Sequence, residues 1–168
     1  MTWQVLGIDP GVTTGWGVIE LATPTSTPRA LRWGTFRAEH ERDVDRHLRD
    51  LLDALPLHAL IGVEQIEGVA YSGKGAGIVP NLLHAKGIES RIRARADIWL
   101  APRFTVDLPA NAWKRILCGR GNADDKLVAQ RLPLHLVGLG KSNEHARDAL
   151  GLAVVVARRM MRPSSLSR

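Results

Sequence analysis

The stretch Val5–Val18, VLGIDPGVTTGWGV, decides how this chain is interpreted. It opens with an apolar run, and Asp9 stands at the end of that run, directly before Pro10 and Gly11. Pro fixes φ at about −65° and Gly tolerates positive φ, so this pair favours a turn. A second run, Gly15–Ile19, follows, and two such runs around a turn indicate a β-hairpin. Because an acid at the end of a buried strand is costly unless it is paired or binds a cation, Asp9 either caps the turn or is a candidate metal ligand.

The length and composition bound the class of protein. At 168 residues, with 45% hydrophobic and 24% charged residues, we expect one globular domain over 1–162 and a frayed tail over 163–168. No apolar run reaches 18 residues, and the N-terminal residues lack the pattern of a signal peptide. The single cysteine, Cys118, cannot form an internal disulfide. These features predict a cytoplasmic protein.

The charge is basic and unevenly distributed. The formal net charge is +6 and the pI is about 10.2, and residues 86–131 contain ten Lys and Arg residues against five Asp and Glu residues. This balance is typical of proteins that bind a polyanion such as nucleic acid. Solvation of the surface by basic side chains is the alternative, and charge alone does not separate the two interpretations.

Hydrophobic periodicity predicts a mixed α/β fold. Strands are expected at 3–9, 14–20, 30–38, 60–64 and 103–108, and helices at 41–55, 81–98, 109–118, 124–132 and 143–161. The first three strands have short connections and favour an antiparallel meander. The helix before the fourth strand permits a parallel pairing with the meander. We therefore predict a five-stranded mixed sheet flanked by helices.

Four side chains stand where this fold could bring them together. Asp9 and Glu64 each end a strand, and His145 and Asp148 lie three residues apart on one face of the last helix. Three carboxylates and an imidazole on one spot would repel each other unless cations neutralise them, and this donor set suits Mg²⁺ or Mn²⁺. Two such ions at about 3.5–4 Å from each other can support phosphodiester hydrolysis. The helix dipole favours a neutral imidazole at His145, the form that ligates metal.

Each of these residues also has an ordinary interpretation. His145 taken alone is a surface residue in a first helical turn, and Asp148 is an early-helix acid of the kind that the dipole favours. The hypothesis of a metal centre therefore depends on the set and not on one member.

The motifs GIDPG, TGWGV, IGVEQ and HARDALGLA together resemble the RuvC family of Holliday-junction resolvases, within the RNase H-like superfamily. The segment LCGRGNADDK also resembles that family's G-x-G-x-A-x-K stretch before a helix. The match covers most of residues 3–157. It implies an RNase H-like fold and a homodimeric endonuclease that cuts four-way DNA junctions with two Mg²⁺ or Mn²⁺ ions per site. It further implies branched DNA as a partner and a branch-migration motor as a possible one.

The resemblance assigns roles to single residues. Asp9, Glu64 and Asp148 match the metal-binding carboxylates, and His145 falls where many members have Asp and some have His. Lys114 and Lys126 align with lysines that contact DNA phosphates in that family, with solvated surface lysines as the alternative. Tyr71, Lys74 and Arg120 are also expected to contact DNA. Glu67 stands where an aromatic residue usually follows the Glu-Gln motif, and Tyr71 is the candidate for its stacking role, with an ordinary surface tyrosine as the alternative.

A dimer is the simplest way to make two opposed cuts in a junction of approximate two-fold symmetry. As in the family, the helix at 81–98 is the expected seam, with Leu82, Leu83 and Ile88 available for burial. The basic side chains that would form a face over the junction arms are Arg91, Arg93, Arg95, Lys114 and Arg120.

Three other functions start from the same sequence features. Actin-like ATPases and sugar kinases open with a similar Gly-Ile-Asp motif, but here Thr13 and Thr14 come one place late, and that fold needs two such domains. A related nuclease could act on other branched DNA or on structured RNA. A non-catalytic junction-binding protein would keep the fold without the chemistry, although all four centre positions are filled.

Overall fold

A computed structural model describes residues 2–38, 40–66, 78–100 and 105–161 of the chain. Its five strands form one sheet in the order β3-β2-β1-β4-β5, with β1, β2 and β3 antiparallel and β1, β4 and β5 parallel. The strands are β1 (Trp3–Asp9), β2 (Thr13–Leu21), β3 (Arg29–Arg37), β4 (Leu60–Gln65) and β5 (Thr105–Pro109). The helices are α1 (Glu41–Asp53), α2 (Ile78–Leu100), α3 (Ala110–Cys118), α4 (Asp125–Arg131) and α5 (Glu144–Met160), with a short 3₁₀ turn, η2, at Leu132–Leu134. The predicted mixed sheet with an antiparallel meander is confirmed.

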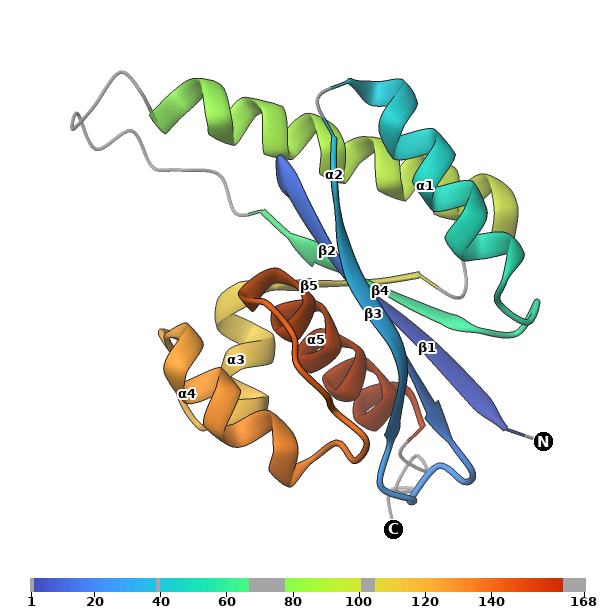
Figure 1. Cartoon of the computed structure of the whole chain (residues 1–168), viewed down its shortest axis with the longest axis vertical. Coiled ribbons are helices and arrows are strands. Elements are labelled where there is room, and N and C mark those ends of the chain that lie inside the picture. Colours follow the sequence, from blue (N-terminus) through green and yellow to red (C-terminus); the bar gives the residue numbers. More distant parts are fainter. Residues whose placement is uncertain (1, 39, 67–77, 101–104, 162–168) are drawn as a thin grey trace, which may run out of the picture.

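Helices cover both faces of the sheet. Figure 1 shows α1 and α2 on one side and α3, α4 and α5 on the other. Alternate residues of a strand face opposite sides, so Val5 packs in the core with α5, while Leu6 and Ile8 pack in the core with α1 and α2. A strand that is buried on both faces needs a continuous apolar run, which is the pattern of β1.

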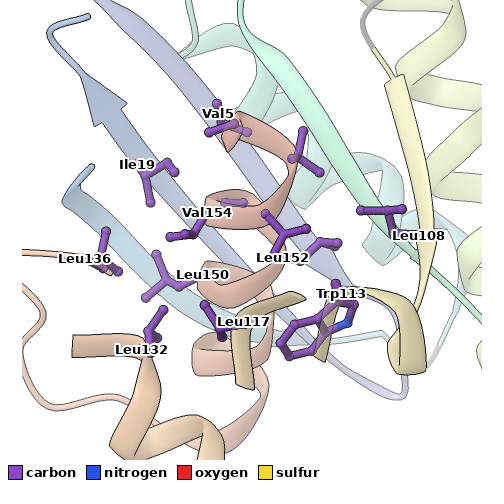
Figure 2. Close-up of a cluster of buried hydrophobic side chains, with 14 of the residues drawn as sticks. Val5, Ile19, Leu108, Trp113, Leu117, Leu132, Leu136, Leu150, Leu152 and Val154 are labelled. Carbon is purple, nitrogen blue, oxygen red and sulfur yellow. The ribbon is translucent and has the colours of Figure 1, made fainter. Parts of the chain in front are cut away.

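The last helix is the centre of one of the two cores. Every residue of α5 from Ala149 to Ala157 is buried, against the sheet on one side and α3 and α4 on the other (Figure 2). A helix that is apolar all round belongs in such a position. Packing therefore fixes the position of α5, and with it the side chains of the first turns of the helix.

Two glycines let α5 lie directly on β1 and β2. A Cβ atom at Gly7 would collide with the backbone carbonyl of Ala149, and one at Gly15 would collide with that of His145. The glycines of the GID and TGW motifs thus bring the N-terminal half of α5 into backbone contact with the strands, at the end of β1 where Asp9 stands.

On the other face, α1 and α2 are joined by ion pairs. Asp45 of α1 accepts hydrogen bonds from the guanidinium groups of Arg91 and Arg95 of α2, at 2.6–3.0 Å. Ile88 of the same helix is 5% exposed and packs in the core with α1. The expectation that Ile88 is available at a subunit seam is therefore wrong, because the fold of one chain already buries it.

The element boundaries agree with the expected ranges to within a few residues. The largest difference at a helix start is α2, which begins at Ile78 and not at 81; Pro80 is tolerated there because the amide groups of a first helical turn need no partner within the helix. Within the described part of the chain, no helix is long and apolar enough to cross a membrane. The predicted tail at 163–168 lies outside the described residues.

Candidate active site

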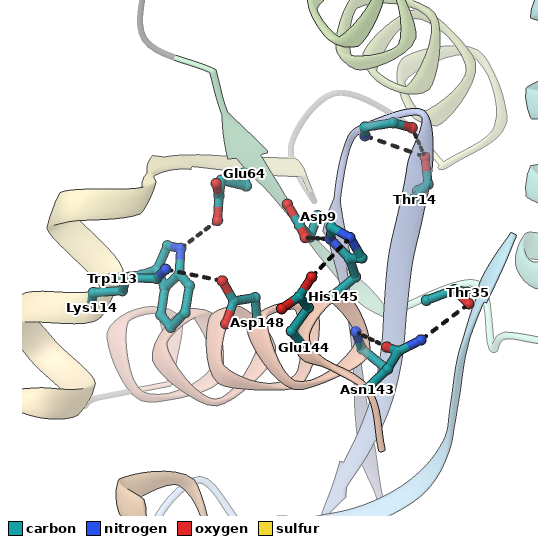
Figure 3. Close-up of polar contacts among 12 residues, drawn as sticks. Asp9, Thr14, Thr35, Glu64, Trp113, Lys114, Asn143, Glu144, His145 and Asp148 are labelled. Atoms are coloured by element: carbon teal, nitrogen blue, oxygen red, sulfur yellow. Dashed lines mark hydrogen bonds and ion pairs between the residues drawn. The ribbon is translucent and has the colours of Figure 1, made fainter. Parts of the chain in front are cut away.

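Asp9 and His145 form the first contact of the site. Asp9 ends β1, and its Oδ2 atom lies 3.0 Å from Nδ1 of His145, in the first turn of α5 (Figure 3). This hydrogen bond is the main cause that raises the pKa of His145, with burial opposing it. The Asp9 carboxylate thus opposes the effect expected from the helix dipole, which favours the neutral ring.

Glu64 and Trp113 form the second contact. Glu64 lies near the end of β4, and its Oε2 atom accepts a hydrogen bond of 2.7 Å from the indole Nε1 of Trp113, which is fully buried in α3. Burial, followed by repulsion from the Asp9 carboxylate, raises the pKa of Glu64 to about 8, against the effect of the indole hydrogen bond. Without a nearby cation, this environment therefore favours the protonated form of Glu64.

Asp148 and Lys114 form the third contact. Asp148 lies one turn after His145 on α5, and its Oδ2 atom is 3.0 Å from Nζ of Lys114 on α3, with both side chains about 15% exposed. Burial raises the pKa of Asp148, and the contact with Asp148 raises the pKa of Lys114 although burial of the ammonium opposes it. The other oxygen, Oδ1 of Asp148, is buried without a hydrogen-bond partner among the described residues.

The loop before α5 fixes where these residues stand. Asn143 caps the helix through a hydrogen bond from the Ala146 amide to its side-chain oxygen, at 2.9 Å. Its amide group also lies 3.4 Å from the Thr35 hydroxyl of β3, and the Trp33 indole donates to the Lys141 carbonyl at 3.2 Å. The start of α5 is thus attached to β3 as well as packed on β1 and β2.

The three acids share one region, and each is held by a different neighbour. Figure 3 shows the Asp9, Glu64 and Asp148 side chains at the same end of the sheet, from β1, β4 and α5. Repulsion from both Asp9 and Asp148 contributes to the raised pKa of Glu64. Across the described ranges, however, no three acidic, His or Cys side chains are close enough together to hold one ion. The predicted convergence on a single spot is thus not present in this arrangement, since His145, Trp113 and Lys114 each hold one acid.

The donor set nevertheless suits a divalent cation. It consists of carboxylate oxygens and one imidazole, and it includes a buried oxygen of Asp148 with no partner among the described residues. It also contains the Glu64 carboxyl group, whose pKa is raised first by burial and then by repulsion from Asp9. A bound cation would give the unpartnered Asp148 oxygen a ligand contact and would favour the charged form of Glu64. The residues that could hold it are Asp9, Glu64, His145 and Asp148.

The remaining predicted site residues lie in different places. Lys114 is part of the centre, while Arg120, in the turn after α3, and Lys126, on α4, are exposed. Tyr71 and Lys74 lie outside the described residues. Of the expected seam residues, Leu83 is exposed, and the side chain of Leu82 also lies outside the described part. Three of the arginines on α2 have acidic partners in the same chain: Arg91, Arg93 and Arg95.

Trp113 contacts Glu64 in the candidate site, and the sequence does not predict this contact. Forty-nine positions separate it from Glu64, and no spacing rule connects the two. In the sequence, only its position next to Lys114 on a short predicted helix connects Trp113 with the site. A tryptophan at that position is explained equally well as part of the hydrophobic core.

Comparison with known proteins identifies similar chains over nearly the whole length. The family model described as crossover junction endodeoxyribonuclease RuvC matches residues 5–156. The chain is 32% identical over 157 residues to the crossover junction endodeoxyribonuclease RuvC of Mesorhizobium japonicum, covering 90% of this chain and 87% of the relative. It is 31% identical over 156 residues to the protein of the same name from Parvibaculum lavamentivorans, covering 89% and 83% of the two chains.

Solved structures resemble the fold. The T. thermophilus RuvC in complex with a Holliday junction substrate superposes with a TM-score of 0.65 at 23% identity, over 93% of this chain and 95% of that one. The Fowlpox virus resolvase in complex with Holliday junction DNA gives a TM-score of 0.52 at 8% identity, over 93% and 99% of the two chains. At these identities the likeness concerns the fold alone.

Proposed function

The chain belongs to the RuvC family, and from that premise we propose that it is a metal-dependent endonuclease that resolves four-way DNA junctions by paired phosphodiester hydrolysis. The observation that carries the proposal is the placement of Asp9, Glu64 and Asp148, from three separate elements, at one end of the sheet with His145 beside them. Burial and mutual repulsion disfavour the charged form of Glu64, and a bound cation would offset both effects.

We propose that two divalent ions, Mg²⁺ or Mn²⁺, bind to Asp9, Glu64, His145 and Asp148. Such ions neutralise the charge of the phosphate and make an attacking water more acidic. Binding requires that Glu64 lose its proton and that the His145 ring be neutral, so cation binding releases protons near neutral pH.

The chain's own side chains prepare the site for this exchange. The Trp113 indole holds one oxygen of Glu64, which leaves the other oxygen of that carboxylate for a ligand. Lys114 neutralises Asp148 while the acid has no cation. If a cation took the place of Lys114 at Asp148, the ammonium group would be available to a DNA phosphate.

Exposed basic residues continue from the centre. Arg120 and Lys126 follow Lys114 along the chain, in the turn after α3 and on α4, and we propose that they contact DNA phosphates. Tyr71 and Lys74 remain predicted DNA contacts. A branch-migration motor as a partner and a cytoplasmic location also remain predictions.

We propose that the chain forms a homodimer, because two opposed cuts need two sites and each chain supplies one. The exposed Leu83 of α2 supports a seam on that helix, whereas Ile88 takes no part in it. Light scattering tests this proposal: a dimer at micromolar concentration agrees with it, and a strict monomer that junction DNA does not change contradicts it.

Cleavage of a panel of substrates tests the function. A synthetic four-way junction, a linear duplex of the same sequence, a flap and an RNA–DNA hybrid are incubated with the protein in Mg²⁺, in Mn²⁺ and in EDTA. We expect symmetric cuts in the junction alone, and none in EDTA. Preferred cutting of the flap or the hybrid would point to a different nuclease, and junction binding without cutting in either metal would point to a non-catalytic binding protein.

A further inference from the structure

Glu89 is a deeply buried acid that the proposed chemistry does not use. It lies on α2, and its side chain is 1% exposed. A buried carboxylate is costly unless ion pairs and hydrogen bonds compensate for the lost water, so the contacts of Glu89 indicate what it does.

Glu89 and Lys86 together hold the backbone of one residue, Ile66. The Oε2 atom of Glu89 accepts a hydrogen bond of 3.1 Å from the Ile66 amide, and Nζ of Lys86 donates one of 2.7 Å to the Ile66 carbonyl. The two side chains also pair with each other at 2.8 Å. We call Lys86 and Glu89 the Ile66 clamp.

A third side chain ties the clamp to the sheet. Nη2 of Arg93 lies 2.7 Å from Oε1 of Glu89, and Nε of Arg93 lies 3.0 Å from the Asp107 carboxylate. Asp107 belongs to β5 and stands opposite Val63 of β4. The clamp is thus anchored to the strand that pairs with β4.

The end of β4 needs such a support. The last pair that β4 makes with β1 is Ile8 with Val63, one residue before Glu64. The last pair with β5 is Gln65 with Pro109, and proline has no amide hydrogen to donate to the ladder. Ile66 therefore lies beyond both ladders, and the clamp supplies the partners for its amide and carbonyl groups.

We propose that Glu89 and Lys86 are positioning residues, which fix the Ile66 peptide and so hold Glu64, two residues earlier, in the orientation that accepts a divalent cation. This inference rests on the proposed role of Glu64 as a cation ligand. Outer residues that orient metal ligands commonly change metal affinity by about tenfold or more when they are removed.

Two variants test the clamp through cation binding and not through cutting alone. Glu89→Gln keeps the size of the side chain and removes the charge, and Lys86→Met keeps the aliphatic stem of a side chain that is 43% exposed. Amide NMR spectra record the hydrogen exchange of Ile66 and the Mg²⁺ concentration at which the resonances of Asp9 and His145 are half shifted. We expect faster exchange at Ile66 and a midpoint that is about tenfold higher in both variants.

Asp45→Asn is the matched control, because it removes the ion pairs that join α2 to α1 and leaves the contacts of α2 with the end of β4 in place. It should leave the Mg²⁺ midpoint within about twofold of the wild-type value, and junction affinity in Ca²⁺ should be unchanged in all three variants. If Glu89→Gln does not fold, the Mg²⁺ midpoint of Lys86→Met alone tests the inference. An unchanged midpoint in a folded clamp variant, or an equal shift in Asp45→Asn, would overturn the inference. A wild-type chain that binds Mg²⁺ but cuts no junction would refute the proposed function and leave this test intact.

Discussion

Replacing Glu64 by glutamine should stabilise the protein in the absence of metal while it abolishes cutting. The glutamine keeps an oxygen that can accept the Trp113 hydrogen bond, and it removes the charge that burial and Asp9 disfavour. A site built to bind a cation is under strain without one, so removal of the repelling charge relieves the folded state.

The magnitude follows from the pKa of Glu64. A carboxyl group whose folded pKa lies above its unfolded value binds its proton more tightly in the folded chain, so stability falls as the pH rises through this window. The rise from 4.5 to about 8 corresponds to an upper limit of about 5 kcal/mol, at about 1.36 kcal/mol per pKa unit. Relaxation and entry of water reduce this, and we expect Glu64→Gln to gain about 1–3 kcal/mol at pH 8, or about 3–8 °C in Tm.

Thermal unfolding in EDTA at pH 5 and pH 8 measures the effect. The gain should be much smaller at pH 5, where the folded wild-type chain keeps Glu64 protonated, and Mg²⁺ should reduce the difference at pH 8 by stabilising the wild type. Glu20→Gln is the control, because Glu20 forms a surface ion pair with Arg29 whose loss should cost at most about 1 kcal/mol. A Glu64→Gln variant that is less stable than the wild type at pH 8 in EDTA, or a gain that is equal at both pH values, would refute this reasoning.

Three further predictions concern the scaffold and the centre. Gly15→Ala places a Cβ against the backbone of His145, so α5 must shift; we expect a loss of about 1–3 kcal/mol in urea unfolding together with strongly reduced junction cutting, and wild-type values for both would contradict the packing described. Asp45→Asn should lose about 1–2 kcal/mol at pH 7. Arg95 and Arg91 hold the pKa of Asp45 far below its ordinary 3.8, so the stability that Asp45 contributes is complete above about pH 4 and is lost as the pH falls. A stability difference between Asp45→Asn and the wild type that grows in acid would contradict this prediction. His145→Asp should keep more cutting activity than His145→Ala, above all in Mg²⁺, which prefers oxygen ligands, and equal rates in both metals would remove His145 from the centre.

The sheet could be predicted from the sequence because its signals are local. The GIDPG turn and the apolar runs of β1 and β4 each lie within a few residues. The helical period of α1 marks its buried face without reference to the rest of the chain. The N-cap at Asn143 is also a local feature, because capping needs only the residues of one turn.

The contacts within the site could not be predicted, because they join residues far apart in the sequence. Trp113 meets Glu64, Lys114 meets Asp148, and Glu89 meets Ile66, each through packing of separate elements. The hydrogen bond from His145 to Asp9 is invisible in the sequence for the same reason, whereas the helix dipole at His145 can be inferred from the sequence. Ile88 was assigned to a seam because its periodicity marks a buried face without saying which partner buries it.

Asp148→Asn, assayed for both junction binding and junction cutting, tests the central claim most directly. Asn removes the charge from α5 at nearly constant volume, and Asp50→Asn, at an exposed position of α1 on the opposite face of the sheet, is the control. We expect Asp148→Asn to bind a four-way junction in Ca²⁺ with a Kd within about threefold of the wild type, since basic side chains supply that affinity. In Mg²⁺ its cutting rate should fall about a thousandfold, equivalent to about 4 kcal/mol of lost transition-state stabilisation, while Asp50→Asn cuts normally. Cutting by Asp148→Asn at the wild-type rate would contradict the assignment of this centre.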